Sequence, residues 1–362
     1  MKKKILAIVL SIVAVILAAV IGVSVFFITD MNGSKNGKDV QIEIKQGTYT
    51  AKIAEILKDE GIINSPLGFR VFAKLKKYES KFKYGHYTFN TGDSYEEIAE
   101  KLITQGAKAA TIKVTIPEGT GINDFVKNVN GKKVTVLGIA SILEKAGVCQ
   151  KADFISALNE VTLEGQLLNE ANNKNTYYAL EGYLFPETYE FYKIDDSKAA
   201  AKAVIEKMLS EAESRVSDDM FKKAESMGYS MHEIMTMASI IQMEAGNDSD
   251  ALPKIAGVFY NRLNSTDFTT LGSSPTIFYG DTFEQDDDRY DTYKIKGLPP
   301  GPLCSPGIKA IKAALNPEGS DYFYFVTDKN GKFYFHKTYA EQTSTINKLK
   351  NDGNWIYEYY NK

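Results

Sequence analysis

Apolar residues along the first third of the chain recur at two spacings, every second residue or every third to fourth, which predicts short strands and helices. Ser94 and Glu97 form a capping box, a typical helix start, just before one of the helical apolar lines. Together these patterns predict a small α+β module at residues 40–110. Its predicted elements are strands at 40–44 and 85–90 and helices at 49–58, 66–75 and 95–103.

The rest of the chain is predicted to be mainly helical. A strand at 112–116 precedes Pro117-Glu118-Gly119, which is predicted to turn the chain into a helical region that reaches about Leu158. Seven aromatic residues then crowd into residues 177–192. Further helices are predicted at 196–216, 218–226, 230–245, 252–263 and 339–350.

Gly and Pro residues divide the C-terminal half. Residues 264–307 are rich in both and are predicted to be loop. Asn330-Gly331, between apolar runs at 322–326 and 332–336, is typical of a β-hairpin. The predicted fold class is α+β, and the predicted divisions of the chain are an N-terminal segment at 1–30, a linker at 31–39, the small module at 40–110, a strand and helical connecting region at 111–172, and a mainly helical domain with a C-terminal hairpin at 173–362.

The N-terminus is predicted to cross a membrane. The stretch from Ile5 to Ile28 has 24 residues and no charge, which suffices to span a bilayer core of about 30 Å as a helix. A cleavable signal peptide has a shorter apolar core and ends in small residues, whereas this stretch ends in Val25-Phe26-Phe27-Ile28. Lysines precede the stretch, so we expect a single-pass anchor in the cell membrane with a cytoplasmic N-terminus. The chain after Asp30 then lies outside the cytoplasm.

Composition narrows the function classes. The chain is 44% hydrophobic and 25% charged, as in globular proteins, which excludes disorder. A net charge of −3 argues against a nucleic-acid partner held through phosphates. Cys149 and Cys304 are too few for a disulfide framework and are interpreted as free, buried thiols. No zinc, calcium or phosphate-loop motif occurs, so we expect neither cofactor nor metal.

Glu244 is the most informative candidate for chemistry. Apolar residues at 234, 237, 238 and 241 form one helical stripe, and Glu244 continues that stripe by three residues, where a Leu would be expected. Desolvation and the negative end of the helix dipole predict a raised pKa for this carboxyl. An acid that keeps its proton near neutral pH can protonate a glycosidic oxygen. The alternative is a solvated or ion-paired acid, for instance one paired with Arg262.

Other polar and aromatic residues are weaker candidates. Arg262, in the run Val258–Leu263, is interpreted either as a clamp for an acidic substrate group, as a residue that orients Glu244, or as part of a buried ion pair. Proline-stiffened loops at 273–276 and 297–302 are interpreted as cleft walls or as simple connections. Aromatic residues are predicted to stack on sugar rings or to belong to the core. They are Tyr183, Phe185, Tyr189, Tyr279 and Tyr293.

Several motifs, in order along nearly the whole chain, resemble those of the MltG (YceG-like) endolytic murein transglycosylases. Besides the apolar N-terminal stretch and the small module, they are Glu181-Gly182-Tyr183-Leu184-Phe185-Pro186-Glu187-Thr188-Tyr189, Ala238-Ser239-Ile240-Ile241 with Glu244, Phe259-Tyr260-Asn261-Arg262-Leu263, Pro275-Thr276 with Tyr279, Tyr290 to Tyr293, Gly297-Leu298-Pro299-Pro300-Gly301 and Tyr324-Phe325-Val326. Ser274, Asp291, Gln242, Phe333 and Gln342 depart from the family's usual residues. Gln242 stands where many members have a second Glu, which leaves Glu244 as the candidate.

The resemblance implies a membrane-anchored enzyme with a LysM-like module at 40–110 and a catalytic domain at 173–362. Such enzymes cleave the β-1,4 bond between MurNAc and GlcNAc in nascent glycan strands without water and leave 1,6-anhydro-MurNAc ends. Glu244 matches the family's catalytic glutamate. The implied partners are peptidoglycan strands, the cell membrane and peptidoglycan synthases. The residues predicted to bind substrate are Tyr183, Glu187, Asn261, Arg262, Thr276, Tyr279, Tyr293, Leu298, Pro299 and Gly301.

Two other functions remain open from the sequence. One is a non-catalytic peptidoglycan-binding scaffold of the cell-wall synthesis machinery, in which Glu244 merely packs. The other is a hydrolytic muramidase that uses Glu187 or Asp281 as the second carboxylate that hydrolysis requires.

Overall fold

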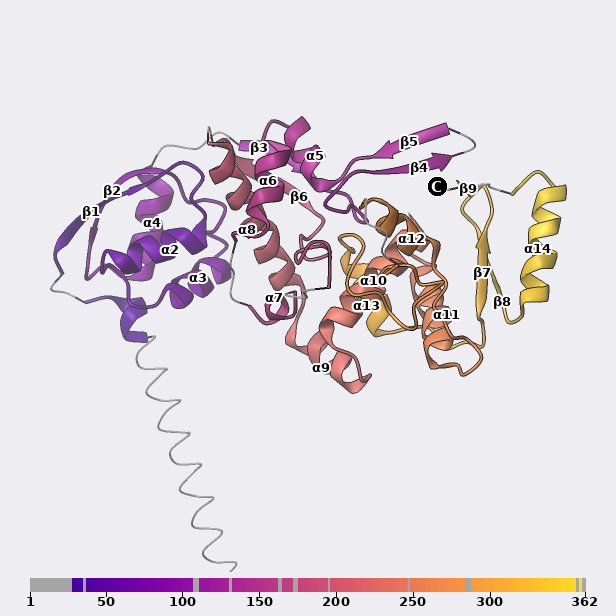
Figure 1. Cartoon of the computed structure of the whole chain (residues 1–362). Coiled ribbons are helices and arrows are strands. Elements are labelled where there is room, and N and C mark those ends of the chain that lie inside the picture. Colours follow the sequence, from indigo (N-terminus) through magenta and orange to yellow (C-terminus); the bar gives the residue numbers. More distant parts are fainter. Residues whose placement is uncertain are drawn as a thin grey trace, which may run out of the picture. The chain divides into compact units, whose positions relative to one another are not determined.

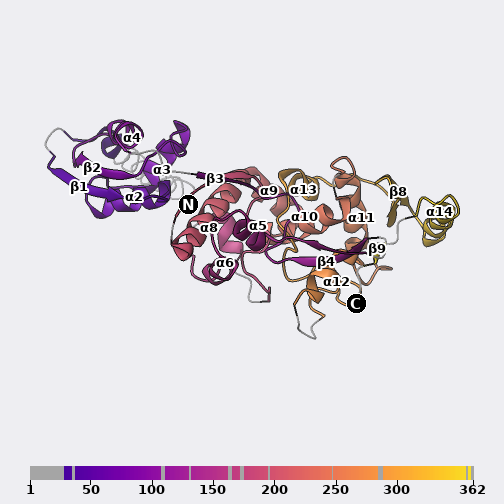
Figure 2. The ribbon, with the colours of Figure 1, turned by 90° about the horizontal axis from the view of Figure 1, so that it is seen from above.

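The computed structural model is a mixed α+β structure with many helices and small sheets (Figures 1 and 2). It describes residues 28–34, 37–106, 111–129, 132–161, 165–171, 175–194, 196–246, 248–283, 288–355 and 358–359. The predicted membrane span lies, apart from Ile28, outside these residues. Within them, no helix is both long and apolar enough to cross a bilayer.

The chain divides into two compact units. Unit 1 comprises the chain up to Thr111 together with Tyr192–Ile194, and unit 2 comprises Ile112–Phe191 and Asp195–Lys362. The finer division that the sequence predicts at residue 172 stays a prediction.

Unit 1 is a two-stranded antiparallel sheet covered by three helices, in the order that the sequence predicts. Ile42 lies opposite Tyr87 in the ladder, and both side chains face the helices and are buried. The capping box of Ser94 and Glu97 is present at the start of the last helix. The elements are β1 (Asp39–Ile44), α2 (Thr50–Asp59), α3 (Pro66–Leu75), β2 (Gly85–Asn90) and α4 (Tyr95–Thr104).

Aromatic rings fill the core of unit 1. Phe69 of α3 is fully buried and lies edge-on to Tyr95 of α4, with ring centroids 5.3 Å apart. Phe69 also stacks on Phe82, at 5.9 Å. Offset and edge-on ring pairs add to the free energy gained from burying their apolar area, so the Phe69 ring is one of the contacts that hold α3 to the module.

Unit 2 carries the remaining elements. The first group is β3 (Thr111–Thr115), β4 (Phe125–Val129), β5 (Lys132–Val136), α5 (Ile139–Lys145), α6 (Lys151–Ala157), α7 (Gln166–Glu170), β6 (Thr188–Tyr192), α8 (Ser197–Arg215) and α9 (Asp218–Ser226). The second group is α10 (Met231–Ala245), α11 (Leu252–Asn264), α12 (Ser274–Asp281), α13 (Ile308–Leu315), β7 (Tyr324–Thr327), β8 (Phe333–His336), α14 (Tyr339–Asn351) and β9 (Glu358–Tyr359).

Helix α10 is the centre of unit 2. It contacts α7, α9, α11, α12 and α13, and Figures 1 and 2 both show it surrounded by neighbouring helices. The predicted apolar stripe is fully buried from Ile234 to Ile241. Neighbouring α11 approaches other backbone closely at Gly257, where a Cβ atom would lie 2.2 Å from the carbonyl oxygen of Glu318. The helix that carries Glu244 therefore has a rigid setting.

The prediction of a helical region from Pro117 to Leu158 was wrong in its first half. Strands β4 and β5 pair in antiparallel fashion there, with Phe125 opposite Val136, and the first helix of the region begins only at Ile139. The sequence holds the reason, because β-branched residues flank Asn130-Gly131, a dipeptide typical of two-residue hairpin turns.

The predicted loop at 264–307 also needs correction. Residues Ser274–Asp281 form helix α12, with Pro275 in its first turn, a position that tolerates proline because the missing N–H has no helical partner there. The predicted C-terminal hairpin is confirmed as β7 and β8, with Phe325 opposite Phe335.

We expect Phe69→Ala to lower the free energy of unfolding of unit 1 by about 3–5 kcal/mol, because the lost ring leaves a cavity that its neighbours cannot fill. Leu67→Ala, on the exposed face of the same helix, is the matched control and should change it by less than about 0.5 kcal/mol. Hydrogen exchange of the core amides of unit 1 measures both. Equal protection in the two variants would contradict this account of the core.

Candidate active site

Glu244 lies in the last turn of α10 with its side chain half-buried. The hydroxyl of Ser273 donates a hydrogen bond to its Oε1 at 2.6 Å. Ser273 is fully buried and precedes the first residue of α12. The helix ends at once, because Gly246 has a positive φ of 57°. The carboxyl that the apolar stripe singles out thus accepts a short hydrogen bond at the edge of the core.

Buried threonines hold Ser273 in place. The N–H of Ser273 donates to Thr292 Oγ1 at 2.9 Å, and Thr276 Oγ1 donates to the carbonyl of Ser273 at 2.6 Å. The hydroxyls of Thr276 and Thr292 are themselves 2.8 Å apart. All three residues are fully buried, so the network is shielded from water and its hydrogen bonds fix one position for the serine hydroxyl.

Arg262 holds the loop that leads to Ser273. Its Nη1 donates to the carbonyls of Leu271 at 2.8 Å and Gly272 at 3.1 Å, and its Nε donates to the carbonyl of Phe323 at 2.7 Å. Its guanidinium also lies over the rings of Phe259, Phe268 and Tyr324. Burial lowers the pKa of Arg262, and the nearby charge of Glu244 acts in the opposite direction. The sequence left three roles open for Arg262. These contacts favour the one in which it orients Glu244, because Arg262 binds the loop that carries Ser273.

Tyr293 is the exposed aromatic residue of this region. Its side chain is 52% exposed, and its hydroxyl lies 3.3 Å from Ser274 Oγ. Gly272, with φ of 66°, lies beneath the ring, since a Cβ there would be 3.7 Å from Tyr293 Cε1. An exposed tyrosine next to a half-buried carboxyl is an arrangement that suits a sugar ring.

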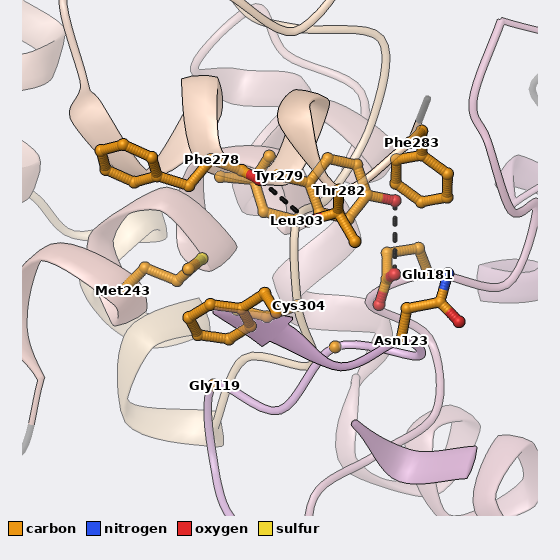
Figure 3. Close-up of a pocket in the computed structure, with 12 residues that line it drawn as sticks. Gly119, Asn123, Glu181, Met243, Phe278, Tyr279, Thr282, Phe283, Leu303 and Cys304 are labelled. Carbon is orange, nitrogen blue, oxygen red and sulfur yellow. Dashed lines mark hydrogen bonds between the residues drawn. The ribbon is translucent and has the colours of Figure 1, made fainter. Parts of the chain in front are cut away.

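A small pocket lies beside this group (Figure 3). Figure 3 shows Met243 of α10 and Phe278 of α12 at one end and Glu181, Asn123 and Phe283 at the other. The pocket has a volume of about 20 Å³, which is enough for a single water molecule. Most of its walls are apolar or aromatic.

Glu181 is a fully buried acid in that pocket. Its carboxyl accepts hydrogen bonds from the backbone N–H of Ile122 at 3.1 Å and from the hydroxyl of Tyr279 at 3.3 Å. Burial outweighs these hydrogen bonds and raises the pKa of Glu181 to about 8. The residue is therefore mainly protonated at neutral pH and joins the loop after β3 to helix α12 without burying a charge.

Several residues predicted to bind substrate are buried supports in this structure. Thr276 belongs to the Ser273 network, and Tyr279 packs beside Glu181 and is 8% exposed. Tyr183 is fully buried, and its hydroxyl lies 2.7 Å from Nδ1 of His232. The other ring nitrogen of His232 lies 2.7 Å from the carbonyl of Pro300. Through His232, Tyr183 thus supports the proline-rich loop.

The remaining predicted residues fall into two places. Pro299 and Gly301 are buried and Leu298 is half-buried in the loop that His232 holds. Asn261 donates to the carbonyls of Ser320 and Tyr322, both at 2.8 Å, and so positions the strand β7.

Glu187 is exposed and forms an ion pair with Arg215 of α8 at 3.0 Å. Its contacts among the described residues are separate from the Glu244 and Ser273 group. The side chain of Asp281 lies outside what the structure describes.

The roles of Ser273 and Thr292 and the burial of Glu181 were not predicted from the sequence. Ser273 stood in a stretch interpreted as a cleft wall, and Glu181 stood in a motif that carried the resemblance. No local pattern marks either residue, because their partners come from other segments of the chain.

Comparison with known proteins gives a consistent result. The sequence profile of the YceG-like family matches residues 42–348. The endolytic murein transglycosylase of Bacillus subtilis strain 168 is 32% identical over 320 residues, which cover 85% of this chain and 84% of that protein. The protein of the same name from Streptococcus pneumoniae strain D39 is 30% identical over 82% of this chain, but the match spans only 56% of the pneumococcal protein.

A solved structure is similar as well. The 2.6 Å crystal structure of a yceG-like protein from Listeria monocytogenes matches with a TM-score of 0.51 at 28% identity. The match covers 86% of this chain and all of that one.

We expect the free energy of unfolding to fall as pH rises through the window between about 4.5 and 8, by on the order of a few kcal/mol. The folded-state pKa of Glu181 lies above its ordinary value of 4.5, so the folded chain binds more protons than the unfolded chain there. Glu181→Gln should flatten this dependence. Urea unfolding of unit 2 at pH 5.5, 7 and 8.5 measures both chains, and an unchanged slope in the variant would contradict the assignment.

Proposed function

The chain belongs to the YceG-like family, and we propose that it is an endolytic murein transglycosylase that cleaves the β-1,4 bond between MurNAc and GlcNAc inside glycan strands. The observation that carries the proposal is the hydrogen bond from buried Ser273 to half-buried Glu244 at the end of α10. This hydrogen bond orients the Glu244 carboxyl at the edge of a packed core. General acid catalysis on a sugar requires a carboxyl that is held in such a way.

One carboxyl suffices for this reaction. Protonated Glu244 donates its proton to the glycosidic oxygen as the bond from C1 of MurNAc to that oxygen breaks, and the GlcNAc portion leaves with a free hydroxyl. The resulting carboxylate then accepts the proton of the C6 hydroxyl of the same MurNAc while its oxygen bonds to C1. The product is a 1,6-anhydro end, and no water is consumed. Glu244 finishes protonated and ready for another cycle.

Ser273 serves the second half of this cycle. A hydroxyl donor stabilises the carboxylate form of Glu244 after the proton has left. Arg262 and the buried threonines act through Ser273, because they bind its loop and its backbone. In this proposal these are positioning residues, and Glu244 is the catalytic residue.

Tyr293 is the proposed sugar platform, because it combines exposure with a place beside Ser274 and Gly272. Leu298, Pro299 and Gly301 are proposed to form a wall of the strand-binding site through the loop that His232 holds. Tyr183, Asn261, Thr276 and Tyr279 are proposed to shape the site from within. Glu187 is proposed as a rim contact.

The predicted N-terminal anchor places this activity at the outer face of the cell membrane. Residues 5–28 are proposed to hold the chain in the bilayer, with the LysM-like module at 40–110 and the catalytic domain at 173–362 outside the cytoplasm. Nascent glycan strands are made at that surface. The proposed partners are therefore these strands and the synthases that make them.

We expect Glu244→Gln to reduce the rate of strand cleavage by roughly 100- to 10,000-fold, because the amide keeps the shape of the side chain but cannot give up a proton. Mass spectrometry of products from uncrosslinked glycan strands measures the loss of anhydromuramyl ends. Glu225→Gln, an exposed carboxyl on α9, is the matched control and should cleave at the wild-type rate.

The products also separate the alternatives. Anhydro ends released by Glu244→Gln at the wild-type rate would remove Glu244 from catalysis. Strand binding without any cleavage by the unmodified chain would favour the scaffold. Reducing ends in place of anhydro ends would favour a hydrolytic muramidase.

We expect Ser273→Ala to lower the cleavage rate by about 10- to 100-fold, the effect of one lost hydrogen bond to a charged group. A carboxyl that has lost this donor keeps its proton to higher pH, so the high-pH limb of the kcat/KM profile should move upward by about one to two pH units. Ser273→Thr, which keeps the hydroxyl, should restore the limb. A slower enzyme with an unmoved profile would reduce Ser273 to a purely structural role.

A further inference from the structure

Helix α3 of unit 1 carries an exposed apolar line. Leu67 is 60% exposed, Val71 49% and Leu75 79%. The three side chains follow one another at intervals of four residues and so share one face of the helix. Phe69 and Ala73, on the other face, are fully buried in the core of the unit. An exposed apolar patch of this kind marks a surface that contacts a membrane or a partner.

Basic residues flank the apolar line. Arg70 and Lys74 lie within the helix, and Lys76 and Lys77 follow it. Lys76 pairs with Glu96 at 2.9 Å, but no ion pair forms at Arg70, Lys74 or Lys77 within the described part of the chain. An apolar line with basic neighbours is the pattern of helices that lie in the headgroup region of a membrane with anionic lipids.

Asp30 ties the start of α3 to the end of the predicted membrane span. Its Oδ1 accepts hydrogen bonds from the backbone N–H and the side-chain amide of Asn64, both at 2.8 Å, and its Oδ2 accepts from the N–H of Ser65 at 2.8 Å. The hydroxyl of Tyr95 also donates to Asp30 Oδ2. Ser65 is the residue that caps α3. Four donors thus fix Asp30, which is buried, at the helix start.

This attachment places α3 close to the bilayer. The predicted span ends at Ile28, and two residues of chain reach at most about 8 Å. The residues just before α3, Asn64 and Ser65, therefore lie within that distance plus the length of the Asp30 side chain and one hydrogen bond of the span. Figure 1 shows the short helix of residues 28–32 beside α3 within unit 1. Ile28 and Met31 on that short helix are exposed as well, at 53% and 39%.

We propose that α3 docks on the outer surface of the cell membrane, with Leu67, Val71 and Leu75 among the lipid headgroups and upper acyl chains and with Arg70, Lys74 and Lys77 on anionic lipid phosphates. The proposal rests on the membrane anchor of the proposed function. It assigns the module a second task, which is to hold the soluble part of the chain against the surface from which it emerges. The charge and the place of the helix favour lipid over a protein partner.

The full chain in lipid nanodiscs tests this docking directly. A fluorescent maleimide is placed on Val71→Cys or, as the matched control, on Gln41→Cys, whose side chain lies on the face of the sheet opposite the core. Cys149 and Cys304 are buried and free, and burial raises the pKa of the Cys149 thiol to about 12, so the new cysteine is the one that reacts. Nitroxide-labelled lipid reports contact with the bilayer, and iodide reports contact with water.

In discs of phosphatidylcholine and phosphatidylglycerol at 3:1 we expect nitroxide lipid to quench the label at 71 and iodide to spare it, with the reverse at 41. In discs of phosphatidylcholine alone the label at 71 should lose part of its lipid contact. Arg70→Gln and Lys74→Gln should each lower the ratio of docked to undocked chain about fivefold in the anionic discs. Leu75→Asp should lower it further, because a charge replaces the most exposed apolar residue of the line.

Iodide quenching at 71 equal to that at 41 would overturn the docking, and so would protection of 71 from both quenchers, which would mean that another part of the protein covers α3. A chain that does not float with lipid would overturn the anchor and the docking together. Strand cleavage is assayed in the same discs. Cleavage without lipid contact at 71 overturns the docking alone, and lipid contact without cleavage overturns the proposed activity alone.

Discussion

The hydrogen bond between Ser273 and Glu244 requires a serine hydroxyl to be held in a water-free setting at the end of a buried helix. Most of unit 2 around the site serves that requirement. Helix α10 is fixed by the helices packed around it, and Ser273 is fixed by Thr276 and Thr292. A carboxyl at a loose helix end would be solvated and would titrate as it does in water. Here the core determines both where the carboxyl lies and which donor it meets.

Several polar side chains in this unit bind mainly backbone groups. Arg262 gives its hydrogen bonds to three carbonyls, and Asn261 gives two to the carbonyls of Ser320 and Tyr322, just before β7. Glu181 accepts from the N–H of Ile122, and its raised pKa removes the cost of a buried charge. Such bonds join loops to helices and stiffen the walls of the site. Asn261, Thr276 and Tyr279, which the sequence predicts as substrate contacts, each donate hydrogen bonds to other groups of the protein.

In each of the two units, one ionisable side chain joins two segments of the chain. In unit 1 a buried aspartate, Asp30, joins the chain that follows the predicted anchor to the start of α3. In unit 2 a half-buried arginine, Arg262, joins the loop before α12 to the residue that precedes the C-terminal hairpin. In each case one ionisable side chain forms hydrogen bonds to two segments and so holds them together. A substitution at such a residue is therefore expected to act on a whole segment and not on a single bond.

The sequence by itself determined the elements whose signals are local. Periodicity, together with the capping box at Ser94, predicted the helices of unit 1, the helices α8 to α11 and the stripe that ends at Glu244, because each depends on residues within one or two turns. Where local signals were weighed wrongly, as at β4 and β5, both strands were missed. Only the tertiary structure decided the partners: Ser273 is 29 residues from Glu244, and Ile122 is 59 from Glu181. Such pairs depend on how distant segments pack, which no spacing along the chain encodes.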